Sequence, residues 1–209
     1  MYAVKEIFFT IQGEGANTGR PAVFCRFSGC NLWTGREADR ADAICRFCDT
    51  DFFGIGLDGG RFDDAAALAD AVESRWPATS TAKRFVVCTG GEPLLQLDEA
   101  LIEELHDRGF VVSVETNGTI AAPPSLDWIC VSPKANTTLV QRQGDELKLV
   151  FPQSGAEPEA FESLQFDHWF LQPMDGPQRE SNTRRAAKYC LQNPRWRLSV
   201  QTHKALGLR

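Results

Sequence analysis

The chain has 209 residues, of which 43% are hydrophobic and 24% charged. This composition is typical of a folded globular protein and excludes collagen-like, coiled-coil and disordered chains. Its 22 basic and 28 acidic side chains give a net charge of −6 at pH 7, which argues against direct binding to the phosphate backbone of a nucleic acid. No apolar run approaches the roughly 20 residues that span a membrane, and Lys5 and Glu6 interrupt any secretory signal, so we expect a cytoplasmic protein with no membrane partner.

Strands are predicted at intervals along the whole chain. Runs rich in valine, isoleucine and phenylalanine, nearly continuous in hydrophobicity, are typical of strands in a parallel sheet. We expect the segment Glu6–Ile11 to add a further strand or a hairpin. The runs lie at Ala22–Phe27, Phe85–Cys88, Phe110–Glu115, Trp128–Val131, Glu146–Phe151, His168–Leu171 and Trp196–Val200.

Helical patterns lie between some of these strands. Asp98 is the predicted N-cap of a helix that Gly109 ends, and two more helices are predicted over Asp63–Trp76 and Ser181–Leu191. Strands that alternate with helices predict an α/β fold of about six βα units, in a single domain over residues 1–209. Six units are too few for a closed eight-stranded barrel, so an open partial barrel or a doubly wound sheet is favoured.

Polar clusters follow six of the predicted strands. Because parallel strands end at one edge of a sheet, where the active sites of barrels are built, we expect the clusters to lie together. Turn formation explains their glycine and proline residues but not their glutamate, lysine and histidine residues. The clusters are Ser28–Cys30, Thr89–Pro93, Thr116–Gly118, Ser132–Lys134, Gln172–Asp175 and Gln201–Lys204.

Seven cysteines, an odd number, indicate reduced thiols or metal ligands rather than a disulfide framework. Cys30, Cys45 and Cys48 are spaced x14 and x2, and three thiolates can hold three irons of a four-iron cluster while the fourth iron stays open. A structural zinc ion needs a fourth ligand, which would be Cys25, Asp49 or a histidine, and the spacing alone favours neither metal. The other thiols are expected to be buried and structural: Cys25, Cys88, Cys130 and Cys190.

The three cysteines, with Phe47 before the last, resemble the cluster motif of the radical S-adenosylmethionine superfamily. Gly90–Pro93 resembles the glycine-rich motif that contacts the amino group of the methionine moiety. Together with Gln12–Gly15, Cys45–Thr50, Glu115–Gly118 and Ser132–Lys134, in this order, they resemble the family of 7-carboxy-7-deazaguanine synthases over nearly the whole chain. The organic-radical activating enzymes share several of these segments.

The x14 spacing departs from the usual x3 of that superfamily, so Asn31–Ile44 contains an insertion in the cluster-binding segment. Its charged side chains predict an exposed loop. The loop is either only longer than usual or forms part of the surface that receives the electron donor. The charged residues are Glu37, Asp39, Arg40 and Asp42.

The resemblance implies a partial, open TIM-like barrel with a radical S-adenosylmethionine core. It implies that a 4Fe-4S cluster reduces S-adenosylmethionine and that the resulting 5′-deoxyadenosyl radical takes a hydrogen from C6 of 6-carboxy-5,6,7,8-tetrahydropterin. Ring contraction, assisted by Mg²⁺, and loss of ammonia would then yield 7-carboxy-7-deazaguanine, a precursor of queuosine. A homodimer and an electron donor such as flavodoxin or ferredoxin are also implied.

The resemblance also assigns roles to residues at the cofactor. Cys30, Cys45 and Cys48 would hold the cluster, and Thr50 a Mg²⁺ ion, which prefers oxygen ligands. A helix cap is the alternative role for Asp49 and Thr50. The residues expected to contact S-adenosylmethionine are Phe47, Cys48, Asp49, Gly91, Ser132, Pro133, Lys134, Gln172, Pro173, Met174 and Asp175.

The substrate is assigned to another set, Ile11, Gln12, Gly13, Arg26 and Thr89. A glutamine presents a donor and an acceptor to an aminopyrimidinone edge, and an arginine presents a fork to a carboxylate, although a surface ion pair is the alternative for Arg26. Further candidates are Glu14, Glu115 and, if the C-terminal tail is ordered rather than solvated, His203.

Two other functions stay open at this point. One is a related radical enzyme such as a glycyl-radical activase, which the substrate would distinguish. The other is a zinc-stabilised binding module without catalysis, which the metal content would distinguish.

Overall fold

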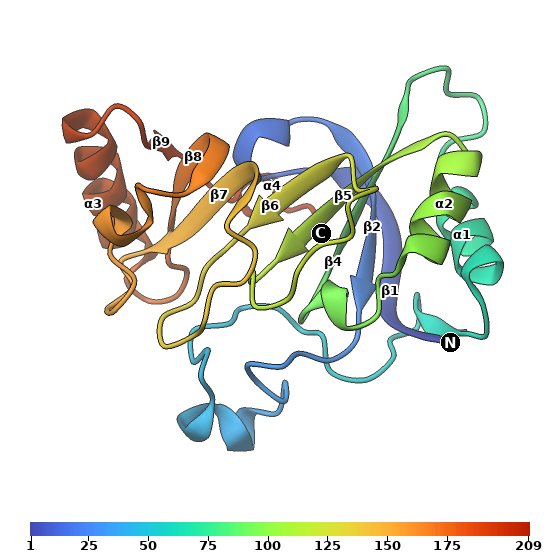
Figure 1. Cartoon of the computed structure of the whole chain (residues 1–209), viewed down its shortest axis with the longest axis horizontal. Coiled ribbons are helices and arrows are strands. Elements are labelled where there is room, and N and C mark those ends of the chain that lie inside the picture. The colour runs from blue at the N-terminus through green and yellow to red at the C-terminus, as the bar shows by residue number, and fades with distance from the viewer.

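Nine strands form one continuous sheet in the computed structural model, which describes residues 1–209 (Figure 1). β1 pairs antiparallel with β2 and β3, and the remaining neighbours run parallel in the order β2-β4-β5-β6-β7-β8-β9. The edge strands β3 and β9 do not pair with each other, so the sheet is open. The bounds are β1 Tyr2–Ile11, β2 Pro21–Phe27, β3 Gly60–Phe62, β4 Arg84–Gly90, β5 Phe110–Thr116, β6 Trp128–Val131, β7 Gln143–Phe151, β8 Gln165–Pro173 and β9 Arg197–Leu198.

Every apolar run that predicted a strand overlaps one, and the parallel sheet is confirmed. The segment Glu6–Ile11 is the inner part of β1, which forms a hairpin with β2. β3 was not predicted because three residues are too few to show a periodicity. β9 is shorter than the predicted Trp196–Val200, and Trp196 is instead buried in the core.

Four α-helices accompany the sheet: α1 Ala65–Glu73, α2 Glu99–Asp107, α3 Arg179–Gln192 and α4 Thr202–Leu206. Asp64 and Asp98 cap α1 and α2 with side-chain hydrogen bonds to backbone N–H groups three residues later, which confirms the predicted cap of α2. None of the helices has the length and apolar character required to cross a membrane. Short 3₁₀ turns complete the chain: η1 Gly15–Asn17, η2 Glu37–Asp42, η3 Pro93–Leu95 and η4 Pro158–Phe161.

Helices follow fewer strands than the expected six or so βα units. No α-helix joins β5 to β6, β6 to β7 or β7 to β8. The segment between β5 and β6 contains Pro123 and Pro124, which disfavour a helix, and the other gaps are short. α4 was not predicted, because five residues give almost no helical pattern.

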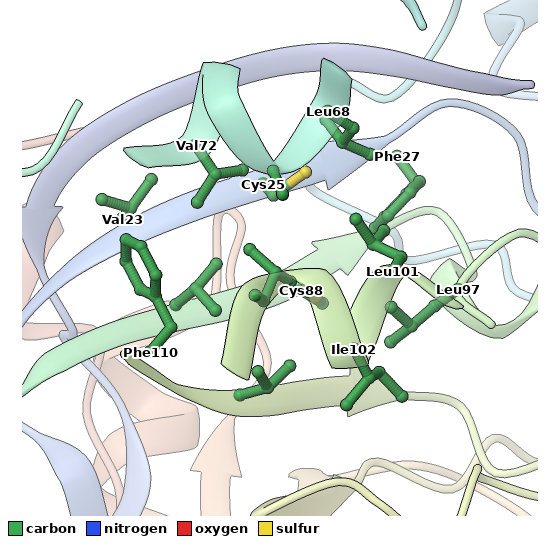
Figure 2. Close-up of a cluster of buried hydrophobic side chains, with 14 of the residues drawn as sticks. Val23, Cys25, Phe27, Leu68, Val72, Cys88, Leu97, Leu101, Ile102 and Phe110 are labelled. Atoms are coloured by element: carbon green, nitrogen blue, oxygen red, sulfur yellow. The ribbon is translucent and has the colours of Figure 1, made fainter. Parts of the chain in front are cut away.

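Two apolar clusters fill the space between the sheet and its helices. The larger holds 20 buried residues, and Figure 2 shows Leu68, Val72, Leu101 and Ile102 of α1 and α2 pointing at the strands. The smaller holds 10 buried residues beneath α3, among them Trp196. α1, α2 and α3 therefore cover one face of the sheet, and the opposite face is left for other uses.

Side-chain alternation decides which strand residues meet that opposite face. On β2, Val23, Cys25 and Phe27 belong to the larger core, so the intervening Phe24 and Arg26 point the other way. On the neighbouring strand β4, Thr89 is paired in register with Arg26, so its side chain points in the same direction as that of Arg26. The sheet thus collects polar side chains on the face away from α1 and α2.

Candidate active site

A cavity of about 470 Å³ lies at the carboxyl edge of the parallel strands. This volume is within the range of small-molecule sites. All six polar clusters contribute to its wall, with residues such as Cys30, Thr89, Asn117, Lys134 and Asp175. Their convergence confirms the expectation that the clusters lie together.

Nearly every residue assigned to a cofactor or a substrate lines this cavity. Two do not line it. Pro133 turns its carbonyl toward the Gln153 side chain, and Gly13 lies behind His203. The lining residues among those assigned are Ile11, Gln12, Glu14, Arg26, Cys30, Cys45, Phe47, Cys48, Asp49, Thr50, Thr89, Gly91, Glu115, Ser132, Lys134, Gln172, Pro173, Met174, Asp175 and His203.

The three cysteines of the motif reach the cavity wall as free thiols. Cys30 follows β2, and its Sγ accepts a hydrogen bond from the Leu32 N–H at 3.4 Å. Burial raises the pKa of the Cys30 and Cys45 thiols, although the Lys134 ammonium opposes this at Cys45. Binding to a metal would deprotonate these thiols, because thiolates are the ligands.

This donor set is compatible with an iron–sulfur cluster, because three free thiols line one cavity and a four-iron cluster takes three thiolates while one iron stays open. No group of three histidine, cysteine or carboxylate side chains that could hold a single metal ion is found in the structure. The prediction that Cys25 could be a fourth zinc ligand is wrong, because its side chain is packed in the core on the other face of the sheet (Figure 2). Asp49, another candidate, is paired with Lys204.

Three of the four cysteines outside the motif are buried, as expected. Cys25 and Cys88 are buried in the larger core, and burial raises the pKa of Cys88 to about 12. Cys130 is buried with its Sγ 3.5 Å from the Glu146 carboxylate, and Cys190 is half-buried on α3.

The glycine-rich turn brings backbone directly against the first cysteine. A Cβ atom on Gly91 would lie 2.2 Å from the Gly29 carbonyl oxygen and 2.7 Å from the Cys30 Cβ, so only glycine fits. The following Glu92 does not line the cavity. Its buried carboxylate accepts hydrogen bonds from the Thr116 hydroxyl and the Asn117 N–H, both at 2.8 Å, and joins the end of β4 to the end of β5.

Lys134 is half-buried at the cavity wall. Its Nζ donates to the Ser132 carbonyl oxygen at 2.6 Å and to the Ser132 hydroxyl at 2.7 Å. Burial lowers the pKa of Lys134, and the thiols of Cys45 and Cys48 oppose that shift. The ammonium therefore supplies positive charge beside the three cysteines.

No helix begins after Asp49 and Thr50, so the helix-cap alternative for these two residues is wrong. Asp49 instead accepts a hydrogen bond from the Lys204 ammonium at 2.6 Å. The Thr50 side chain lies on the cavity wall without a hydrogen-bond partner in the chain and is available to a ligand.

A buried lysine organises the polar groups deeper in the cavity. The Lys148 Nζ lies 2.9 Å from the Glu14 carboxylate and 2.8 Å from that of Glu115. Burial alone would raise the pKa of Glu14, but Lys148 lowers it to about 2. Gln12 donates to Glu115 at 3.3 Å, so the predicted Gln12, Glu14 and Glu115 form one network with Lys148.

Arg26 forms the ion pair that was its alternative role, yet it also lines the cavity. Its Nε donates to Glu6 at 2.8 Å, and both side chains are about one-fifth exposed, 18% and 20%. The Arg209 guanidinium pairs with the same Glu6 carboxylate, so the C-terminal residue closes this side of the site.

The C-terminal tail is ordered, so the alternative of a solvated tail is wrong. The Thr202 N–H donates to the Gly13 carbonyl at 2.9 Å, which docks α4 onto the chain after β1. A Cβ on Gly13 would lie 2.2 Å from the His203 Nδ1, so the glycine admits the imidazole. Burial lowers the pKa of His203.

Several lining residues were not identified from the sequence. Lys148 was counted only as part of a strand, although a lysine between apolar strand residues signals a buried charge that needs partners. Glu6 and Arg209 carried no signal, because their partners are distant in sequence, and Lys204 was identified only as part of the cluster Gln201–Lys204. In the insertion, Glu37 and Asp42 are exposed as expected, whereas Asp39 and Arg40 are half-buried and Leu32, Trp33 and Ala43 are buried.

Comparisons with known proteins give consistent matches over the full length. The chain is 65% identical to the 7-carboxy-7-deazaguanine synthase of Bradyrhizobium diazoefficiens over 209 residues, which is 100% of this chain and 99% of that protein. It is 58% identical to the 7-carboxy-7-deazaguanine synthase of Burkholderia multivorans over 208 residues, 99% of each protein. The crystal structure of QueE from Escherichia coli superposes with a TM-score of 0.71 at 26% identity, over 97% of this chain and 94% of that one. No family model matches the chain.

Proposed function

The chain belongs to the 7-carboxy-7-deazaguanine synthase family, a radical S-adenosylmethionine lyase family of queuosine biosynthesis, and on this premise we propose how its cavity performs the reaction. The substrate is a small molecule. We propose that it is 6-carboxy-5,6,7,8-tetrahydropterin, bound beside S-adenosylmethionine and a 4Fe-4S cluster.

One observation carries this proposal. A single cavity gathers three free cysteines, a glycine turn pressed against the first of them, and a polar network on its other side. A cluster ligated by Cys30, Cys45 and Cys48 would keep one iron open for S-adenosylmethionine and would supply the electron that cleaves its sulfonium. A glycyl-radical activase would not need the guanine-like recognition described below.

The residues around the cysteines are suited to the polar ends of S-adenosylmethionine. Gly91 lines the cavity beside Cys30 and would meet the methionine amino group with its backbone, and the Lys134 ammonium beside Ser132 would bind a carboxylate. Asp49 and Asp175, both lining the cavity, would accept hydrogen bonds from ribose hydroxyls. Phe47, Gln172, Pro173 and Met174 complete that part of the wall.

The deeper network is suited to a pterin. Gln12 and Glu115 present an acceptor, a donor and a carboxylate to an aminopyrimidinone edge, and the Lys148 ammonium pairs with both Glu115 and Glu14. Arg26 would bind the pterin carboxylate, with Ile11 and Thr89 on either side. His203 is held against Gly13 and faces the same space.

We assign Mg²⁺ to Thr50, whose hydroxyl has no partner within the chain. One hydroxyl with substrate oxygens and waters would complete the oxygen environment that magnesium prefers. The ion would neutralise the pterin carboxylate and thereby assist ring contraction.

The finer features of the fold and its setting are also proposals. The open parallel sheet is interpreted as a partial TIM-like barrel that forms a single domain over residues 1–209. We also propose a flavodoxin or ferredoxin as electron donor and a homodimer, which the resemblance to the family supports, and a cytoplasmic location, which the reduced cysteines support.

Anaerobic reconstitution tests the proposal. The chain, supplied with iron and sulfide, is expected to bind about four irons, the content of one such cluster. With dithionite it should cleave S-adenosylmethionine, and with added Mg²⁺ it should convert the carboxylated tetrahydropterin faster. A colourless protein that retains only zinc, or cleavage without conversion of the pterin, would contradict the proposal.

A further inference from the structure

The inserted segment Asn31–Ile44 is folded back onto the cysteines rather than extended into solvent. The Ile44 and Cys45 N–H groups both donate to the Leu32 carbonyl oxygen, at 3.1 and 3.3 Å, so the chain returns to the point where it left. Its extra length therefore closes a loop and does not separate Cys45 from Cys30.

An apolar cluster holds this closed loop in place. Trp33 and Ala43 from the two ends of the insertion are buried with Phe52, and Cys30 and Cys48 pack against them. The Trp33 and Phe52 rings meet edge to face with centroids 5.5 Å apart. The insertion is therefore packed against two of the three cysteines.

Arg40 connects the insertion to the remaining part of the motif. Its guanidinium lies over the Trp33 ring, 4.1 Å from the centroid, and its Nε donates to both Glu37 carboxylate oxygens at 2.8 Å. One terminal nitrogen donates to the carbonyl oxygens of Arg46 and Cys48, at 2.9 and 3.1 Å. These carbonyls belong to the short segment that contains the last two cysteines.

The geometry of these contacts requires an arginine. A planar guanidinium stacks on an indole and donates in several directions at once, whereas an ammonium concentrates its charge at one point. The loop Cys45–Cys48 has no helix or strand of its own, so its carbonyl groups depend on such a donor for a fixed conformation.

We propose that Arg40 is a positioning residue that holds the Cys45–Cys48 segment ready for the cluster, and that the insertion is the scaffold that carries Arg40. This inference rests on the proposed function, since it takes the three cysteines to be the cluster ligands. It gives the insertion a role in cofactor retention inside the protein.

Three variants test the proposal. Arg40→Met keeps an unbranched stem and removes the donors, and Arg40→Lys restores the charge and part of the donor capacity. Arg36→Met is the matched control, because Arg36 belongs to the same loop and lies 5.1 Å over the Phe53 ring but donates to neither carbonyl of the cysteine segment.

The first measurement is the rate at which a chelator removes iron from each reconstituted protein. We expect Arg40→Met to lose iron about tenfold faster than the wild type, because the loss of charge-assisted hydrogen bonds has an effect of about this size. The rate for Arg40→Lys should lie between the two, and Arg36→Met should lose iron at the rate of the wild type. Equal rates for Arg40→Met and the wild type would overturn the inference. A wild-type chain that takes up no iron would instead contradict the proposed function.

The second measurement uses the cluster-free chain and so does not depend on the cofactor. Mass spectrometry after limited alkylation is expected to show Cys45 and Cys48 reacting faster in Arg40→Met, with Cys30 unchanged because β2 and the Leu32 N–H hold it. The thermal midpoint should stay near that of the wild type, since the insertion adds no strand to the sheet. Faster alkylation of all three cysteines with a lowered midpoint would indicate general unfolding and overturn the assignment.

Discussion

The Lys204 ammonium lies 2.6 Å from the Asp49 carboxylate, although the two residues are 155 positions apart. The same Nζ lies 2.6 Å from Asp175, so one side chain of α4 joins the loop of the cysteines to the loop after β8. Hydrogen bonds from Lys204 lower the pKa of Asp175. The C-terminal tail is thereby connected to both carboxylates assigned to the cofactor.

Replacing Lys204 by Met is expected to weaken binding of S-adenosylmethionine. The two carboxylates would lose their shared partner, and a partly exposed ion pair is worth at most about 1 kcal/mol, which corresponds to about a fivefold increase in KM for the cofactor. Steady-state kinetics at saturating pterin measure this change. Lys188→Met on the exposed side of α3 is the control, and an unchanged KM in Lys204→Met would refute the connection.

Replacing Lys148 by Met is expected to destabilise the fold strongly. The Lys148 side chain is 4% exposed, and its loss leaves the half-buried Glu14 and Glu115 carboxylates without a cation. Removal of one partner from a buried ion pair costs about 3–5 kcal/mol in the free energy of unfolding. Urea denaturation of the cluster-free chain at neutral pH gives the value, with the exposed Lys83→Met as control. A loss of less than about 1 kcal/mol would show that the network is solvated.

Glu14 is expected to add stability that disappears in acid. Its pKa is lowered from 4.5 to about 2 in the folded chain, so folding favours its ionised form. The contribution is therefore full above about pH 4.5 and is lost as the pH falls toward 2. The difference in unfolding free energy between the wild type and Glu14→Gln should narrow over that range, and Glu103→Gln, at an exposed position, is the control for the substitution itself. A difference that does not change with pH would contradict the lowered pKa.

Gly91→Ala is expected to prevent cofactor assembly while the sheet persists. The new methyl group would overlap with the Gly29 carbonyl oxygen and the Cys30 Cβ, so the first cysteine must move. Iron content after reconstitution should fall, and the far-ultraviolet circular dichroism should stay that of the wild type. Gly60→Ala, where no neighbouring atom comes nearer than 3.3 Å, serves as the control. Full iron content in Gly91→Ala would show that the turn tolerates a side chain.

Local signals in the sequence were sufficient for most of the fold. Hydrophobic runs located the parallel strands, and Asp98 identified the start of α2, because these features depend only on neighbouring residues. The same runs located the polar clusters, since each follows a strand. The short elements β3 and α4 were missed because so few residues show no pattern.

The sequence alone determined which residue types gather at the carboxyl edge of the sheet, because each polar cluster directly follows a strand and parallel strands end at the same edge. Only the tertiary structure decided which of those residues touch. Lys148 lies between Glu14 and Glu115, Lys204 between Asp49 and Asp175, and Arg40 against the Cys48 carbonyl. These contacts depend on strand register and on the paths of the loops between strands. A buried charge pairs with the oppositely charged group that the fold places next to it, and that group can be distant in sequence.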